Sequence, residues 1–144
     1  MTQVDFYILD SESDVARWQL ACKIVDKATQ LDHHVYIHST SDDEARKLDE
    51  LLWTFSQGSF IPHQVVRSEL KSPALEPVLI GVNQPPGPGR WDVLINLATD
   101  VPEFFSRYER VAEVVDANTV RREQSRERYR YYRDRGYKLN THQV

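Results

Sequence analysis

The residues best suited to chemistry in this chain are arginines and tyrosines in positions 121–138. This segment has eight basic and three acidic side chains and therefore a charge of +5, in a chain whose net charge is −4. The rest of the chain accordingly carries −9. A positive segment in an acidic protein indicates a defined anionic partner rather than general adhesion to nucleic acids or membranes.

The basic segment is predicted to form a helix over about residues 119–135, capped by Asn118 or Thr119 and ending near Gly136. At about 100° per residue, one sector of this helix brings together four arginines and a tyrosine. These residues, called the basic ridge below, are Arg122, Arg126, Tyr129, Arg130 and Arg133. Guanidinium groups bind carboxylates or phosphates through paired hydrogen bonds, and a tyrosine ring offers apolar contact. The basic ridge therefore suits an acidic peptide with a hydrophobic end.

Two other interpretations of this helix fit the residue types. Glu123 and Glu127 lie at helical spacings from neighbouring arginines, so the helix could be a solvated surface held by ion pairs. Arginine and tyrosine also contact nucleic-acid backbones and stack on bases. Sequence physics alone leaves all three interpretations open.

Catalytic and nucleotide-binding motifs are missing where the fold would place them. The turn after the first predicted strand, residues 10–14, contains three acids that would repel a pyrophosphate. The segment Pro86-Gly87-Pro88-Gly89 lacks the spacing and the lysine of a phosphate-binding loop. The acids at 42–44 fit the start of a helix, where negative charge interacts favourably with the helix dipole. We therefore expect no catalytic residues and no bound nucleotide.

Metal and thiol chemistry are also weakly supported. No cysteines or acids at the usual zinc spacing complete a ligand set with the histidines His33, His34 and His38. The single Cys22 has apolar neighbours, which favours a buried thiol over a nucleophile. The sequence therefore predicts no metal site and no cofactor.

Strands and helices alternate in the first part of the chain. A strand at 4–9 precedes an amphipathic helix, and a second strand at 35–38 precedes a helix whose capping box is Ser41 and Glu44. This order implies parallel strands joined by right-handed crossovers. The sequence predicts a Rossmann-like three-layer α/β fold, with a mostly parallel central sheet flanked by helices and no nucleotide-binding glycine loop.

The later part of the chain is less regular. Apolar runs predict strands at 78–82, 91–97 and 111–115, and Pro102 predicts the start of a short helix. Residues 56–59 are predicted to be a loop, and 60–63 are too short and proline-interrupted for a strand. A mobile loop is expected at about 83–90, because it combines prolines and glycines.

Length and composition predict a single domain over residues 1–144. The chain has 40% hydrophobic residues, enough for one core. It has no apolar run of the roughly 18 residues that a membrane helix needs, and its first residues do not resemble a signal peptide. We therefore expect a cytoplasmic protein with no membrane contact.

Six segments together carry a resemblance to a known family. They are Phe6-Tyr7-Ile8-Leu9-Asp10, Leu48-Asp49-Glu50-Leu51-Leu52-Trp53, Ser59-Phe60-Ile61-Pro62-His63, Asp92-Val93-Leu94-Ile95-Asn96-Leu97, Arg126-Glu127-Arg128-Tyr129-Arg130 and Gly136-Tyr137-Lys138-Leu139-Asn140-Thr141. In these segments the chain resembles, from end to end, the chi subunits of bacterial DNA polymerase III.

The resemblance implies a non-catalytic accessory subunit of the polymerase III holoenzyme. Family members link the clamp loader, through the psi subunit, to the acidic C-terminal tail of single-stranded DNA-binding protein, which ends in phenylalanine. Association with DNA would then be indirect, the isolated subunit would be a monomer, and any polymerase activity would belong to the holoenzyme. The alternatives are a direct nucleic-acid binder that uses the arginine-rich helix, and a small Rossmann-like enzyme.

The resemblance also implies site residues. Arg122, Arg126, Tyr129 and Arg130 occupy the family's tail-binding positions, although the family often has lysine in place of Arg122 and Arg130, which changes hydrogen-bond geometry.

The psi-binding site is implied at different residues. Phe60 matches a phenylalanine that contacts psi, and Trp53 is a second candidate. From the residues alone, Phe60 fits a core position as well as an interface.

Overall fold

The central element of the fold is a seven-stranded sheet in which every pairing is parallel. The computed structural model describes residues 1–55 and 60–144, so the loop predicted at 56–59 lies outside the described residues. The strand order is β3-β4-β2-β5-β6-β1-β7. The strands are β1 (Gln3–Ile8), β2 (Val35–Ser39), β3 (His63–Val66), β4 (Val78–Val82), β5 (Val93–Asn96), β6 (Arg110–Val115) and β7 (Lys138–Gln143). The predicted α/β fold with a parallel sheet is confirmed.

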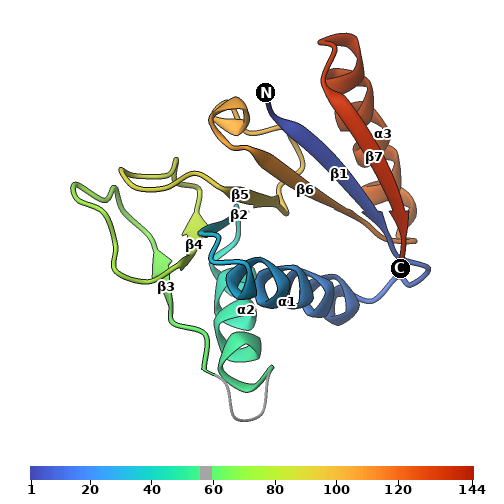
Figure 1. Ribbon diagram of the computed structural model, residues 1–144. Coiled ribbons are helices and arrows are strands. Elements are labelled where there is room, and N and C mark those ends of the chain that lie inside the picture. The colour runs from blue at the N-terminus through green and yellow to red at the C-terminus, as the bar shows by residue number, and fades with distance from the viewer. Residues whose placement is uncertain (56–59) are drawn as a thin grey trace.

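Helices cover both faces of the sheet. They are α1 (Asp14–Gln30), α2 (Asp42–Thr54) and α3 (Thr119–Asp134), with a short 3-10 turn η1 (Phe105–Arg107). Helices α1 and α2 pack together on one face, and α3 lies beside β7 and β6 on the other (Figure 1). The sheet is therefore the middle layer of three, as the sequence predicted.

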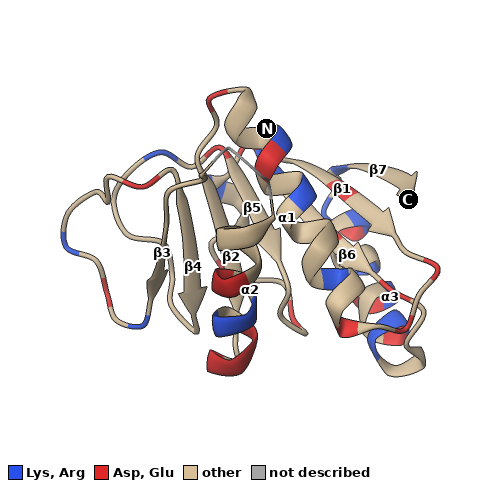
Figure 2. Ribbon diagram, turned by 90° about the horizontal axis from the view of Figure 1, so that it is seen from below, with Lys and Arg blue, Asp and Glu red and all other residues tan. Residues whose placement is uncertain are grey.

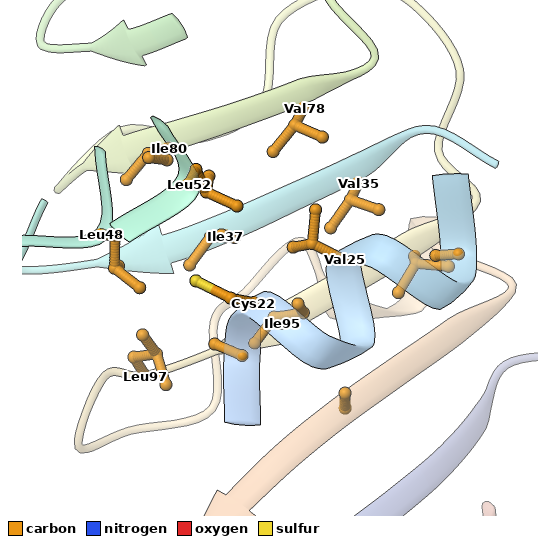
Figure 3. Close-up of a cluster of buried hydrophobic side chains, with 14 of the residues drawn as sticks. Cys22, Val25, Val35, Ile37, Leu48, Leu52, Val78, Ile80, Ile95 and Leu97 are labelled. Atoms are coloured by element: carbon orange, nitrogen blue, oxygen red, sulfur yellow. The ribbon is translucent and has the colours of Figure 1, made fainter. Parts of the chain in front are cut away.

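The core between the sheet and the α1–α2 layer is aliphatic. Alternate residues of the central strands, such as Ile37 of β2 and Ile95 of β5, face this layer. They meet Cys22 and Val25 of α1 and Leu48 of α2 (Figure 3). Fully buried side chains of this size each contribute roughly 1.5–3 kcal/mol by leaving water.

The core beneath α3 is aromatic. Phe6 of β1, Phe105 of η1 and Tyr132 of α3 pack edge to face, with ring centroids 5.2 to 6.0 Å apart. Such pairs add roughly 0.5–1.5 kcal/mol beyond the area that they bury. The position of α3 on the sheet therefore depends on ring packing.

The ends of α3 are set by local hydrogen bonding. The Asn118 side chain accepts a hydrogen bond from the Arg121 backbone N–H at 3.0 Å, as an N-cap does. Gly136 follows the helix with φ of +80°, a conformation that costs side-chain-bearing residues energy. The chain then turns directly into β7.

Three sequence expectations need correction or completion. The helix predicted after Pro102 is only the 3-10 turn η1, because Tyr108 already has extended geometry and β6 begins at Arg110. A strand, β3, starts at His63, the last residue of the segment 60–63 that was judged too short for a strand, and continues to Val66. The sequence also gave no indication of β7, since an edge strand with one exposed face lacks the apolar run of a central strand.

A buried ionic network ties α3 to the sheet. Glu113 of β6 is fully buried and accepts hydrogen bonds from Arg128 Nε at 2.9 Å and Tyr132 OH at 2.7 Å, both on α3. Asn96 Nδ2 of β5 donates to the same carboxylate at 3.0 Å, and Arg128 Nη1 donates to the Thr99 carbonyl at 2.8 Å. Burial and the adjacent carboxylate raise the pKa of Tyr132. The hydrogen bonds give the buried carboxylate and each of its three donors a partner inside the protein.

We predict that Arg128→Ala lowers the free energy of unfolding by about 3 kcal/mol or more, because it leaves the Glu113 carboxylate buried without its cation. Urea unfolding measures this change. Arg130→Ala, on the same helix but exposed, is the matched control and should change stability by no more than about 0.5 kcal/mol. An Arg128→Ala protein as stable as the control would show that the ion pair does not hold α3 in place.

Candidate functional site

A groove of about 510 Å³ lies between α3 and the sheet, at the carboxyl ends of β1, β6 and β7. Three residues of the basic ridge, Arg122, Arg126 and Tyr129, line it from the helix side. Ligands of open parallel α/β folds bind outside the carboxyl ends of the strands. The groove, called the α3 groove below, therefore occupies the edge of the fold where a binding site is expected.

The sheet supplies the apolar wall of the α3 groove. Phe6 and Ile8 of β1 and Val115 of β6 line it opposite the arginines. The ring of Tyr129 meets Phe6 edge to face, with centroids 5.1 Å apart, and is 37% exposed. An aromatic group entering the groove would therefore contact apolar surface on one side and guanidinium groups on the other.

The sequence did not reveal this wall. Phe6 and Val115 come from strands more than 100 positions apart that become neighbours only through the parallel pairing of β1 with β6. Apolar strand residues are also ordinary core material, so their type gives no signal of a site. Asp10 is the one acidic residue among the described residues that line the α3 groove.

Some basic side chains of α3 are anchored by buried acids, and others are paired only at the surface. Arg128 is held by Glu113, and Arg121 donates to the buried Asp116 carboxylate, with its Nη1 3.0 Å from Asp14. The hydrogen bond to Asp116 raises the pKa of Arg121. These two arginines anchor the helix, and the positive charge that lines the α3 groove comes from Arg122 and Arg126 of the basic ridge.

The exposed arginines of the ridge have weak partners within the helix. Arg126 Nη1 lies 3.0 Å from Glu123, Arg130 pairs with Glu127, and both positive and negative residues are spread along α3 (Figure 2). Exposed pairs of this kind are worth about 0–1 kcal/mol, so a carboxylate ligand can replace them at little cost. Arg122 is half-buried, and its Nε donates to the Asp116 carbonyl at 3.2 Å, which fixes its direction. Arg130 is not among the residues that line the α3 groove.

A second surface is formed by aromatic residues at the C-terminal end of α2 and in the segment that leads into β3. Trp53 and Phe60 stack with ring centroids 4.7 Å apart and an interplanar angle of 27°. Trp53 is 59% exposed and Phe60 56% exposed, so neither ring belongs to the core. His63 approaches Trp53 edge-on at 5.3 Å. The structure thus rules out the core position that residue type alone allowed for Phe60.

The remaining residues considered for nucleophilic or metal chemistry lie in positions that do not favour it. Burial raises the pKa of the Cys22 thiol to about 12, so the reactive thiolate is scarce at neutral pH. His38 is buried against Phe104, and burial lowers its pKa. Among residues 1–55 and 60–144, no three His, Cys, Asp or Glu side chains are grouped as metal ligands would be. None of the helices in that part of the chain is long and apolar enough to span a membrane.

Comparison with known proteins matches the chain over nearly its whole length. The family model described as "DNA polymerase III chi subunit, HolC" matches residues 1–140. The DNA polymerase III subunit chi of Pseudomonas aeruginosa is 38% identical over 144 residues, covering 100% of this chain and 98% of the relative. That of Escherichia coli is 32% identical over 145 residues, covering 98% and 97%. That of Haemophilus influenzae is 28% identical over 139 residues, covering 96% and 95%.

Proposed function

The chain belongs to the family of DNA polymerase III chi subunits, and we propose that it is a non-catalytic adaptor within the replicative polymerase. On one side it binds the psi subunit and through it the clamp loader. On the other side it binds the acidic C-terminal tail of single-stranded DNA-binding protein. Its association with DNA is then indirect.

The observation that carries the proposal is the composition of the α3 groove. Cations on one wall and apolar side chains on the other match a tail that is acidic and ends in a phenyl ring with a free carboxylate. In our proposal the terminal ring lies against Ile8 and Val115, flanked by Tyr129. Arg126 holds the terminal carboxylate, and Arg122 and Arg130 bind upstream acids through charge-assisted hydrogen bonds.

The proposed psi surface is the exposed Trp53–Phe60 stack. A cluster of large exposed aromatic rings typically marks a protein interface, because aromatic anchors dominate binding energy when a partner covers them. This stack and the α3 groove are built from different elements, α2 and its following segment in one case and α3 with β1, β6 and β7 in the other. The two partners can therefore bind at the same time.

We predict that Arg126→Ala weakens binding of a short acidic peptide ending in Pro-Phe by about 2 kcal/mol or more, roughly 30-fold, because it removes the donor to the terminal carboxylate. Isothermal titration calorimetry measures the affinity. Arg133→Ala is the matched control, since Arg133 is exposed on the same helix but does not line the groove. Affinity should also fall with rising salt, because salt screens the exposed charges. Part of the affinity should persist, because the ring contact is apolar.

Two results would contradict the tail assignment. One is a folded Arg126→Ala protein that binds the peptide as the wild type does. The other is equal binding of an amidated peptide that lacks the phenylalanine. Binding of single-stranded DNA with no binding of either peptide would instead support a direct nucleic-acid binder.

For the psi surface, Phe60→Ala should weaken the heterodimer with the cognate psi by about 2 kcal/mol or more while leaving peptide affinity unchanged. Surface plasmon resonance with immobilised psi measures the loss. Leu75→Ala, which removes another highly exposed apolar side chain, should have no effect. The assignment fails if Phe60→Ala leaves psi affinity intact.

The isolated chain should show no polymerase, nuclease or nucleoside-triphosphatase activity. The turn after β1 presents acids rather than a glycine-rich phosphate cradle, and Ser13 caps α1 by accepting from the Ala16 N–H at 3.3 Å. Assays on purified protein with each substrate class provide the measurement. Turnover that copurifies with the chain through several columns and vanishes on its unfolding would refute this prediction.

A further inference from the structure

A second groove lies on the opposite face of the sheet, beside α1. Its volume is about 730 Å³, and it runs between α1 and the strands β1 and β6. Leu20 and Ile24 of α1 form one wall, and Tyr7 of β1 contributes to the other together with Leu9, which follows that strand. We call it the α1 groove. It contains neither the arginines of the α3 groove nor the Trp53–Phe60 stack.

The α1 groove exists because the helical layer on this face is narrower than the sheet. Helix α2 contacts β2, β3 and β4, and α1 contacts β2 and β6. No other helix of residues 1–55 and 60–144 lies on this side, so the outer strands β1 and β7 are left without a helix over them (Figure 1). Parallel sheets are normally covered on both faces. The uncovered part of this sheet face lies alongside α1, where a third helix would complete the layer.

The charge around the α1 groove is positive. Lys23 and Lys27 lie one turn apart on the exposed flank of α1, and Arg110 of β6 lines the groove from the sheet. The one acidic residue among the described lining residues is Asp5, which is buried and already paired with Arg110 at 3.5 Å and His142 at 3.1 Å. Two lysines without an opposing acid therefore flank an apolar floor in a protein whose net charge is −4.

We propose that the α1 groove receives an amphipathic helix of another protein, whose apolar face is flanked by carboxylates. The apolar face would cover Tyr7, Leu20 and Ile24, and the carboxylates would pair with Lys23 and Lys27. Helix α1 has 17 residues, so a partner helix packed along it would have about four to five turns. This inference does not rest on the proposed function of the α3 groove.

Two designed peptides test the charge and shape of the site. Both are 18-residue helices with the same leucine face, flanked by glutamates in one and by lysines in the other. Titration of ¹⁵N-labelled protein, followed by amide shifts, gives both location and affinity. We expect the glutamate peptide to shift Tyr7, Leu9, Leu20 and Ile24 and to bind at least about tenfold tighter than the lysine peptide. Attraction by overall charge would favour the lysine peptide instead, because the protein is acidic.

Variants separate the α1 groove from other positive surfaces. The double change Lys23→Glu and Lys27→Glu alters only exposed side chains and should reverse the preference between the peptides. Lys47→Glu with Lys71→Glu makes the same change in net charge elsewhere and should leave the preference intact. In an Arg126→Ala background, which disables the α3 groove, shifts at Leu20 and Ile24 should persist.

Three outcomes would overturn the proposal. The first is equal binding of the two peptides, or no shift at the α1 groove with either one. The second is shifts confined to α3, which would assign the acidic peptide to the basic ridge. The third is self-association in sedimentation experiments that is lost in Ile24→Glu, which would make a second copy of this chain the occupant.

Discussion

The buried pairing of Glu113 with Arg128 and Tyr132 is the constraint on which the rest of the structure depends. A carboxylate in a strand beneath a helix is tolerated only when hydrogen-bond donors surround it, and here both α3 and β5 supply them. These bonds fix the rotation of α3 about its own axis. With this rotation, Arg128 and Tyr132 face the sheet. The neighbouring residues Arg122, Arg126 and Tyr129 then lie at the edge of the sheet where the α3 groove forms.

The same geometry gives a fold associated with nucleotides a groove of different chemistry. All seven strands end at one edge, and in many α/β proteins that edge binds phosphate through a glycine-rich turn. Here the turn after β1 contains acids, and the positive charge comes from one helix face instead. Phosphate cradles use backbone N–H groups, whereas the α3 groove offers guanidinium groups beside apolar side chains. That combination suits a carboxylate next to an aromatic ring, because the apolar side chains offer a bare phosphate no contact.

Much of this arrangement was predictable from the sequence, because it depends on local periodicity. Helical spacing placed Arg122, Arg126 and Tyr129 on one face, and the alternation of strands and helices gave the parallel sheet. What was not predictable depends on contacts distant in the chain. Phe6 and Val115 form the apolar wall only because β1 pairs with β6. Glu113 offered one signal, a single acid within the apolar strand 111–115, but nothing in the sequence identified Arg128 as its partner.

We propose that the α3 groove holds the aromatic end of an acidic tail. Intermolecular nuclear Overhauser effects between the terminal phenyl ring of an acidic Pro-Phe peptide and methyl-labelled protein test this placement most directly. We expect contacts from the ring to the methyl groups of Ile8 and Val115. Contacts confined to methyl groups of the α1 groove, such as those of Leu20 and Ile24, or no contact with Ile8 and Val115 in a saturated complex, would contradict it.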